Sequence, residues 1–144
     1  MKFSEFTTGM VLQSRPYRVE ASEIVEFATR FDPQWFHTDA AQAHQGRWGG
    51  LIASGWHSCS IAMRLAVDTA LVDSESYGSP GVDYIKWPAP LRAGESVQLH
   101  LHILEARRSS SGRVGVVRWQ WFLKTPAGDT VVELVATSLF SPSQ

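Results

Sequence analysis

Asp32 and His37 are the residues of this sequence whose types and spacing best suit acid–base chemistry. They lie five positions apart in the segment Phe31–Asp39. Pro33 stiffens the chain between them, so a turn can direct both side chains into one cavity. A carboxylate beside an imidazole makes a general acid and base pair, because histidine titrates close to neutral pH. An aspartate before proline also forms turns, and a loop histidine is commonly exposed, so the spacing alone leaves a structural role open.

A second segment, Gly49–His57, places glycine and serine at the start of the longest predicted helix. Glycine lets a ligand approach the backbone closely, and the first N–H groups of a helix have no partner within it. Such N–H donors, aligned with the helix dipole, stabilise a carbonyl that becomes enolate-like. Gly50 and Gly55 equally suit close packing of the helix against a sheet. The segment is no phosphate loop, since it lacks the lysine of the GxxxxGK[ST] pattern.

The elements that must hold these segments follow from the periodicity of the apolar residues. Helical spacing predicts a short helix over Ser22–Phe31, with Ser22 as its N-cap, and a second over Ala40–His44, capped by Asp39. The residues between these helices are expected to form a loop. The longest helix is predicted over Leu51–Leu71, with a wide apolar stripe made of Ile52, Trp56, Cys59, Met63, Ala66 and Ala70.

After an expected loop over Asp73–Pro80, the pattern changes to alternation with period two, which predicts strands. Runs at 97–103, 117–123 and 131–140 are separated by turn segments, so they form an antiparallel meander. Gly81–Pro90 is predicted to add a strand, and Thr7–Glu20 is an early extended stretch. One apolar helix and a long antiparallel sheet can both be buried if the sheet wraps around the helix. The expected class is therefore α+β, a hotdog fold with an antiparallel β-sheet around one long central α-helix, in one domain over residues 1–144.

The composition favours an ordinary soluble protein and excludes several classes of function. The formal net charge is -1, so no basic field attracts nucleic acid or an anionic membrane. The single cysteine, Cys59, cannot form an intramolecular disulfide. No signal-peptide pattern and no run of eighteen apolar residues occurs, so we expect a cytoplasmic protein.

Three segments in the same order resemble the MaoC-like dehydratases and (R)-specific enoyl-CoA hydratases, a hotdog family. Asp32–Asp39 is similar to their hydratase motif, an aspartate with a histidine five positions on and another aspartate two positions later. Gly50–Leu65 resembles the start of the family's central helix, and Lys86–Glu95 resembles a later turn between strands. The resemblance runs from the first helix to the last strand.

The resemblance implies a hydro-lyase that hydrates a trans-2-enoyl-CoA thioester to a 3-hydroxyacyl-CoA, or catalyses the reverse dehydration. Asp32 and His37 would activate the water, and the Gly55 N–H would polarise the thioester carbonyl. No metal or other cofactor is implied. The alternatives are a hotdog acyl-CoA thioesterase and a non-catalytic hotdog subunit that binds acyl-CoA or a partner protein. Exposed edge strands of such a fold favour a homodimer.

The sequence departs from the family pattern at several positions near the motif. Gln34 and Trp35 stand where many members have Asn-Pro, Ser54 stands where many have histidine, and Met63 matches a serine of some hydratases. Ser54 is expected to contact the substrate beside Gly55. A short or unusual acyl group is expected, because aromatic residues would narrow its pocket: Trp35, Phe36 and Trp56.

Other reactive side chains are better explained by packing or surface roles. His100 and His102 alternate along one strand and have no acidic or cysteine partners nearby in sequence, so a polar sheet face is expected and no metal site. Cys59 lies on the predicted apolar stripe and is expected to act as a small hydrophobe. His57 either reaches the pocket or packs in the core.

Overall fold

The computed structural model describes residues 1–143. Six strands form one antiparallel sheet in the order β1-β4-β5-β6-β3, with β2 pairing beside β1 on β4. The strands are β1 (Val11–Gln13), β2 (Tyr17–Arg18), β3 (Ser76–Lys86), β4 (Ser96–Arg108), β5 (Gly115–Lys124) and β6 (Thr130–Phe140). The helices are α1 (Ala21–Phe31), α2 (Trp35–Thr38), α3 (Ala40–Gln45) and α4 (Gly55–Ala66), with a 3-10 turn at Phe3–Glu5 and a π-helical turn at Val67–Leu71.

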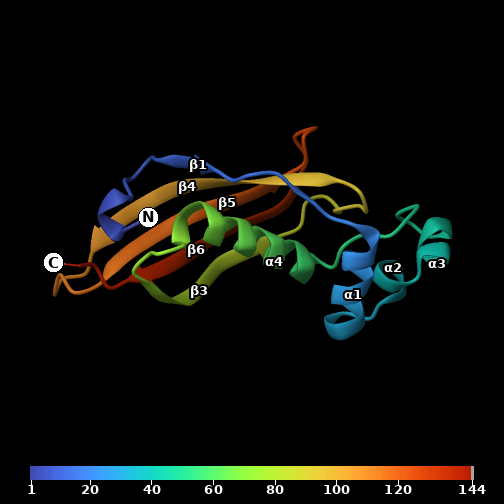
Figure 1. The fold of residues 1–144 in the computed structure, drawn as a ribbon, viewed down its shortest axis with the longest axis horizontal. Coiled ribbons are helices and arrows are strands. Elements are labelled where there is room, and N and C mark those ends of the chain that lie inside the picture. The colour runs from blue at the N-terminus through green and yellow to red at the C-terminus, as the bar shows by residue number, and fades with distance from the viewer. Residues whose placement is uncertain (144) are drawn as a thin grey trace.

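The sheet curves around α4, which lies along its inner face (Figure 1). Alternate residues of β4 and β5 are buried, as expected for strands with one face on the core and the other outward. They pack with the inner side of α4 in a single cluster that includes Ile61, Ala62, Leu65, Leu99, Leu101, Trp119 and Leu123. This is the hotdog fold, and the predicted α+β class and β4–β5–β6 meander are confirmed.

The predicted central helix is correct in place and in its end at Leu71, which the π-helical turn after α4 reaches, but it is wrong in its start and in part of its buried face. It begins at Gly55 because the residues before it pair with a distant loop: Ala53 N–H donates to Leu91 O at 2.8 Å. Trp56 and Met63, expected on the buried stripe, are 59% and 44% exposed. The side of the helix that faces the sheet carries Ile61 and Leu65 together with two alanines, which allow a close approach to the curved sheet.

The N-terminal elements differ from the prediction by local details. Helix α1 begins one residue early, with Glu20 at the N-cap position and no side-chain cap, so Ser22 is not the cap. The expected loop after it contains the four-residue helix α2. The Asp39 cap of α3 is confirmed by a hydrogen bond from Gln42 N–H at 2.9 Å. Strand β3 begins at Ser76, inside the expected loop.

The position of the short helices determines where chemistry is possible. Helices α1, α2 and α3 gather at one end of the molecule, next to the N-terminal end of α4 (Figure 1). The segment Phe31–Asp39 therefore lies beside the segment that opens α4, although the two are separated in sequence. Within residues 1–143, no helix is long and apolar enough to span a membrane.

Candidate active site

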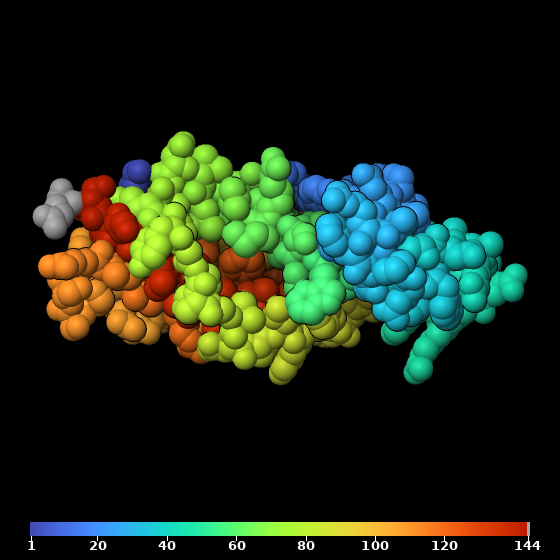
Figure 2. All heavy atoms as spheres, turned by 90° about the horizontal axis from the view of Figure 1, so that it is seen from below, coloured from blue at the N-terminus to red at the C-terminus, as the bar shows by residue number. Residues whose placement is uncertain are grey.

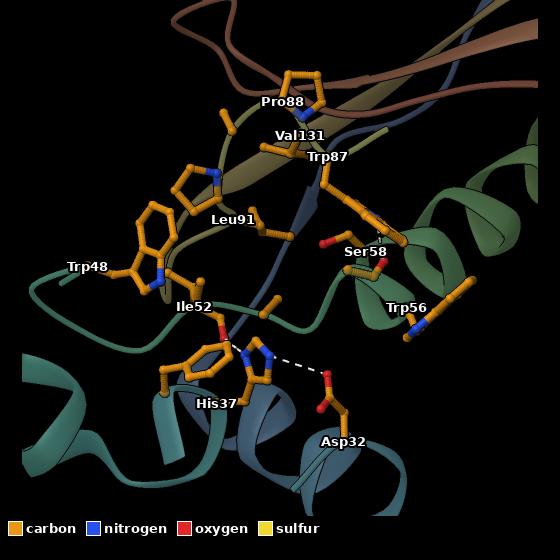
Figure 3. Close-up of a pocket in the computed structure, with 15 residues that line it drawn as sticks. Asp32, His37, Trp48, Ile52, Trp56, Ser58, Trp87, Pro88, Leu91 and Val131 are labelled. Atoms are coloured by element: carbon orange, nitrogen blue, oxygen red, sulfur yellow. Dashed lines mark hydrogen bonds and ion pairs between the residues drawn. The ribbon is translucent and has the colours of Figure 1, made fainter. Parts of the chain in front are cut away.

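A cavity of about 360 Å³ opens where the segment around α2 meets the start of α4. Figure 3 shows His37 and Asp32 at one side of it and Pro88 and Val131 at the opposite side. The lining is mostly apolar and aromatic, and its polar side chains are few. The residues are Asp32, Phe36, His37, Trp48, Ile52, Ala53, Gly55, Trp56, Ser58, Trp87, Pro88, Ala89, Pro90, Leu91 and Val131.

Asp32 and His37 meet at this cavity. His37 Nε2 lies 3.3 Å from Asp32 Oδ2, and the His37 side chain is buried whereas 19% of the Asp32 side chain is exposed. On the other side of the ring, His37 Nδ1 lies 2.6 Å from Ile52 O. Because a carbonyl oxygen only accepts, Nδ1 carries the proton of the neutral ring and Nε2 is then free to accept one. In the protonated ring both nitrogens donate, and the Nε2–H faces the Asp32 carboxylate.

The Asp32 carboxylate receives a hydrogen bond on each oxygen. Gln34 Nε2 donates to Oδ1 at 2.7 Å and Ser54 Oγ donates to Oδ2 at 2.7 Å. Burial acts to raise the pKa of Asp32, but the hydrogen bonds from Gln34 and Ser54 and the charge of His37 together hold the pKa below its ordinary value. Asp32 is therefore ionised at neutral pH.

The start of α4 presents free backbone donors to the same cavity. Ser54 occupies the N-cap position, but its side chain makes no cap hydrogen bond, since its hydroxyl donates to Asp32. Among residues 1–143, no hydrogen-bond acceptor is found for the backbone N–H groups of Gly55 and Trp56, which line the cavity. These N–H groups lie at the positive end of the helix dipole, so they suit a developing negative charge on a ligand oxygen.

Trp87, which the sequence did not identify as a site residue, covers the first residue of α4. Its Nε1 donates to Gly55 O at 2.9 Å, and its ring stands edge-on to the Trp56 ring with centroids 5.2 Å apart. Trp87 follows β3, about thirty residues away from Gly55 in sequence. Pro88 and Pro90, which follow it, indicate an irregular segment in the sequence, but they do not indicate which element this segment covers.

Comparison with known proteins shows the family to which this chain belongs. The family model for the MaoC like domain matches residues 3–120. The chain belongs to this family. A crystal structure of the MaoC-like dehydratase from Rhodospirillum rubrum is 32% identical, with a TM-score of 0.89 over 98% of this chain and 97% of that one.

Two further similar proteins extend the comparison of this MaoC-like protein. The uncharacterized protein YdeM of Bacillus subtilis is 28% identical over 105 residues, which are 73% of this chain and 74% of YdeM. The R-hydratase PhaJ1 from Pseudomonas aeruginosa shares the fold, with a TM-score of 0.75 and 19% identity over 99% of this chain and 86% of that one.

Of the four residues of the MaoC-like protein that the sequence predicted to bind substrate, two line the cavity and two do not. Trp56 and Gly55 line the cavity. Trp35 does not: its ring lies against Gly46, where a Cβ atom would come within 2.6 Å of it. Ser54 is fully buried beneath the lining and contacts Asp32, so its position favours support of the carboxylate over contact with a substrate.

A second polar cluster lies outside the cavity of the MaoC-like protein. His57 Nε2 lies 2.9 Å from Glu23 Oε2, and the Tyr17 hydroxyl donates to the other oxygen of Glu23. Burial, followed by the effect of Glu23, raises the pKa of Tyr17 to about 12. The His57 ring stacks on Phe27 with centroids 4.7 Å apart, so the cluster fastens α4 to α1.

Metal ligands do not gather anywhere in residues 1–143, where no three His, Cys, Asp or Glu side chains lie close enough to hold an ion. His100 and His102 are half-exposed on the outer face of β4, and His102 stands edge-on to Phe122. Cys59 is free and half-buried on α4.

Proposed function

We propose that this protein is a hydro-lyase that interconverts trans-2-enoyl-CoA and 3-hydroxyacyl-CoA thioesters. The observation that carries the proposal is the Asp32–His37 pair, whose facing oxygen and nitrogen both accept hydrogen bonds and lie at the wall of a cavity. A water molecule has two O–H donors and can donate one to each of these two atoms from the cavity side of the pair. Membership of the MaoC-like family supports this assignment.

The proposed reaction uses the two groups together with the start of α4. Water held by Asp32 Oδ2 and His37 Nε2 adds to the β-carbon of the enoyl thioester while His37 accepts a proton from it. The thioester carbonyl accepts a hydrogen bond from the Gly55 N–H, so the negative charge that reaches the oxygen is stabilised. The protonated His37 then delivers this proton to the α-carbon, which completes the addition of water and returns the ring to its neutral form.

The size of the cavity supports a short acyl group. Its volume of about 360 Å³ is near the lower end of ordinary ligand pockets, which hold about 300–1,000 Å³. Trp48, Trp87 and Phe36 narrow it with rigid rings. We therefore propose an acyl chain of roughly four to six carbons, with the coenzyme outside the cavity.

A homodimer through β3 is proposed as the assembly. This strand has 11 residues, lies at the end of the sheet and pairs only with β6. Its Tyr77 and Val82 are 56% and 47% exposed. Figure 2 shows that α4 and β3 leave a hollow between them, in which atoms of β5 and β6 are visible. An unpaired edge strand with exposed apolar side chains is a surface that a second copy can cover.

The test is an assay of the wild-type protein with crotonyl-CoA and longer trans-2-enoyl-CoA esters. Loss of the conjugated enoyl absorbance without release of free thiol is the expected result, with the highest kcat/KM for the shortest esters. Release of thiol would identify a thioesterase instead. No change in any ester, with the protein folded and binding coenzyme A, would favour a non-catalytic subunit.

A further inference from the structure

The two positions at which this chain departs most clearly from the family pattern meet on one side chain. Gln34 stands in place of an asparagine and Ser54 in place of a histidine, and they reach Asp32 from two different segments, the link between α1 and α2 and the start of α4. Each donates one hydrogen bond of 2.7 Å to Asp32, one to each carboxylate oxygen. We propose that Ser54 and Gln34 are positioning residues that keep the Asp32 carboxylate ionised and directed at His37. This inference rests on the proposed function for its catalytic meaning, but not for its test.

The backbone explains why Asp32 needs such support. Asp32 ends α1 with φ -154° and ψ 67°, outside the helical conformation, and the next residue is a proline. Its side chain is thus attached to the C-cap residue that follows Phe31 and not to a turn within the helix. Gln34 N–H donates to Asp32 O at 2.8 Å, so the same residue fixes both the main chain and the carboxylate of Asp32.

The side chain of Ser54 forms a hydrogen bond that is unusual for a residue at the N-cap position of a helix. A serine there commonly accepts a hydrogen bond from an N–H of the first helical turn. Here the hydroxyl is fully buried and donates across to Asp32, 22 residues earlier in the chain, and the side chain does not cap α4. The contact therefore joins the two halves of the site, the end of α1 and the start of α4.

The hydrogen bonds from Gln34 and Ser54 determine which chemical role Asp32 takes and which role His37 takes. Hydrogen bonds to a carboxylate stabilise its ionised form, and these bonds outweigh the opposing effect of burial on Asp32. A carboxylate held ionised is a weak proton acceptor but a fixed negative charge. We assign to Asp32 the orientation of the water and the stabilisation of protonated His37. The His37 Nε2 lone pair, which the Ile52 carbonyl leaves free, takes the proton.

The experiment measures the titration of Asp32 directly, by NMR of the protein labelled with ¹³C at the aspartate carboxyl groups. Asp32→Asn assigns the signal. The compared variants are Ser54→Ala and Gln34→Met, which remove one donor each. Ser60→Ala and Gln45→Met are matched controls: the Ser60 hydroxyl donates only to Trp56 O, and Gln45 is exposed in α3.

In the wild type the Asp32 midpoint is expected below the ordinary value of 3.8. Ser54→Ala should raise it by about one pH unit, since a hydrogen bond to a charged group is lost from a buried position. Gln34→Met should raise it by less, because Gln34 is exposed to water. This shift of the Asp32 midpoint is itself the readout that a purely structural role of Ser54 or Gln34 would not cause.

An unchanged midpoint in both variants would overturn the proposal. If Ser54→Ala fails to fold, Gln34→Met decides alone, because its side chain lies at the surface. The NMR titration needs no substrate. A protein without hydratase activity but with the expected shifts would therefore refute the proposed function and leave the support of Asp32 established.

Discussion

The indole of Trp87 lies against Gly55 so closely that no side chain fits between them. A Cβ atom at position 55 would come within 2.5 Å of Trp87 Cε2 and 2.7 Å of Nε1. The same ring is held in place by its hydrogen bond to Gly55 O at 2.9 Å. Gly55, whose N–H would polarise the thioester carbonyl, and Trp87 of the cavity wall thus position each other.

Gly55→Ala is expected to destabilise the protein and lower its activity. Alanine favours a helix over glycine by about 1 kcal/mol. Overpacking costs about 1–3 kcal/mol, and the contact here is with a rigid ring, so the second effect should dominate. Thermal unfolding and kcat/KM measure the outcome. Gly78→Ala is the control, since a Cβ there meets nothing within 4 Å. A Gly55→Ala protein as stable and active as the wild type would contradict the contact.

Trp87→Leu should widen the acyl cavity and change the preference for acyl length. The ring forms part of the wall between the Asp32–His37 pair and Val131 (Figure 3). Its loss should raise kcat/KM for eight-carbon relative to four-carbon enoyl-CoA esters. It should also rescue Gly55→Ala, which a double-mutant cycle of unfolding free energies would measure as coupling. An unchanged ratio of the two esters would mean that the acyl group does not reach Trp87.

The stability of the protein should depend on His57 in mildly acidic solution. Burial lowers the pKa of His57 below its ordinary value of 6.5 despite the attraction of Glu23. The unfolded chain therefore binds a proton that the folded protein does not, and the free energy of unfolding falls as the pH drops below about 6.5. For one proton the slope is at most about 1.4 kcal/mol per pH unit.

His57→Gln is the variant that tests this dependence. Glutamine keeps a donor for Glu23 but does not titrate, so urea unfolding at a series of pH values should show a flatter curve than the wild type. His44→Gln, at an exposed position in α3, should keep the wild-type slope. Equal slopes for the wild type and His57→Gln would show that another group is responsible.

The sequence revealed the parts of the site that depend on local order and missed those that depend on long-range packing. Asp32 and His37, five positions apart, meet in the structure at a distance of 3.3 Å, because Pro33 turns the chain after Asp32 and the short helix α2 carries His37. Trp87 was missed because nothing local says which element the chain after β3 will cover.

The exposed side of α4 shows the same limit. Hydrophobic periodicity placed Trp56 and Met63 on the buried stripe, yet both are exposed, and the sheet contacts smaller residues such as Ala62. Periodicity marks apolar faces but not which of them the chain itself covers. A large apolar residue left exposed on a helix next to an edge strand is consistent with a surface used for assembly.

The proposed dimer predicts a molar mass twice the 16.0 kDa of the chain. Val82→Lys places a charge on β3 and should shift the protein toward the monomer in light scattering coupled to gel filtration. Val11→Lys is the control, because Val11 is also exposed but lies on β1 at the opposite edge of the sheet. A wild-type monomer, or equal effects of the two variants, would contradict assembly through β3.

The most direct test of the central claim compares crotonyl-CoA hydration by the wild type, Asp32→Asn and His37→Ala. Asp129→Asn and His44→Ala change the same residue types at exposed positions away from the cavity. Loss of a positioned acid or base lowers rates by about 10²–10⁴-fold. The account predicts losses of this size in the first two variants, with their folds intact, and near wild-type rates in the controls. Hydration that persists without Asp32 and His37 would contradict it.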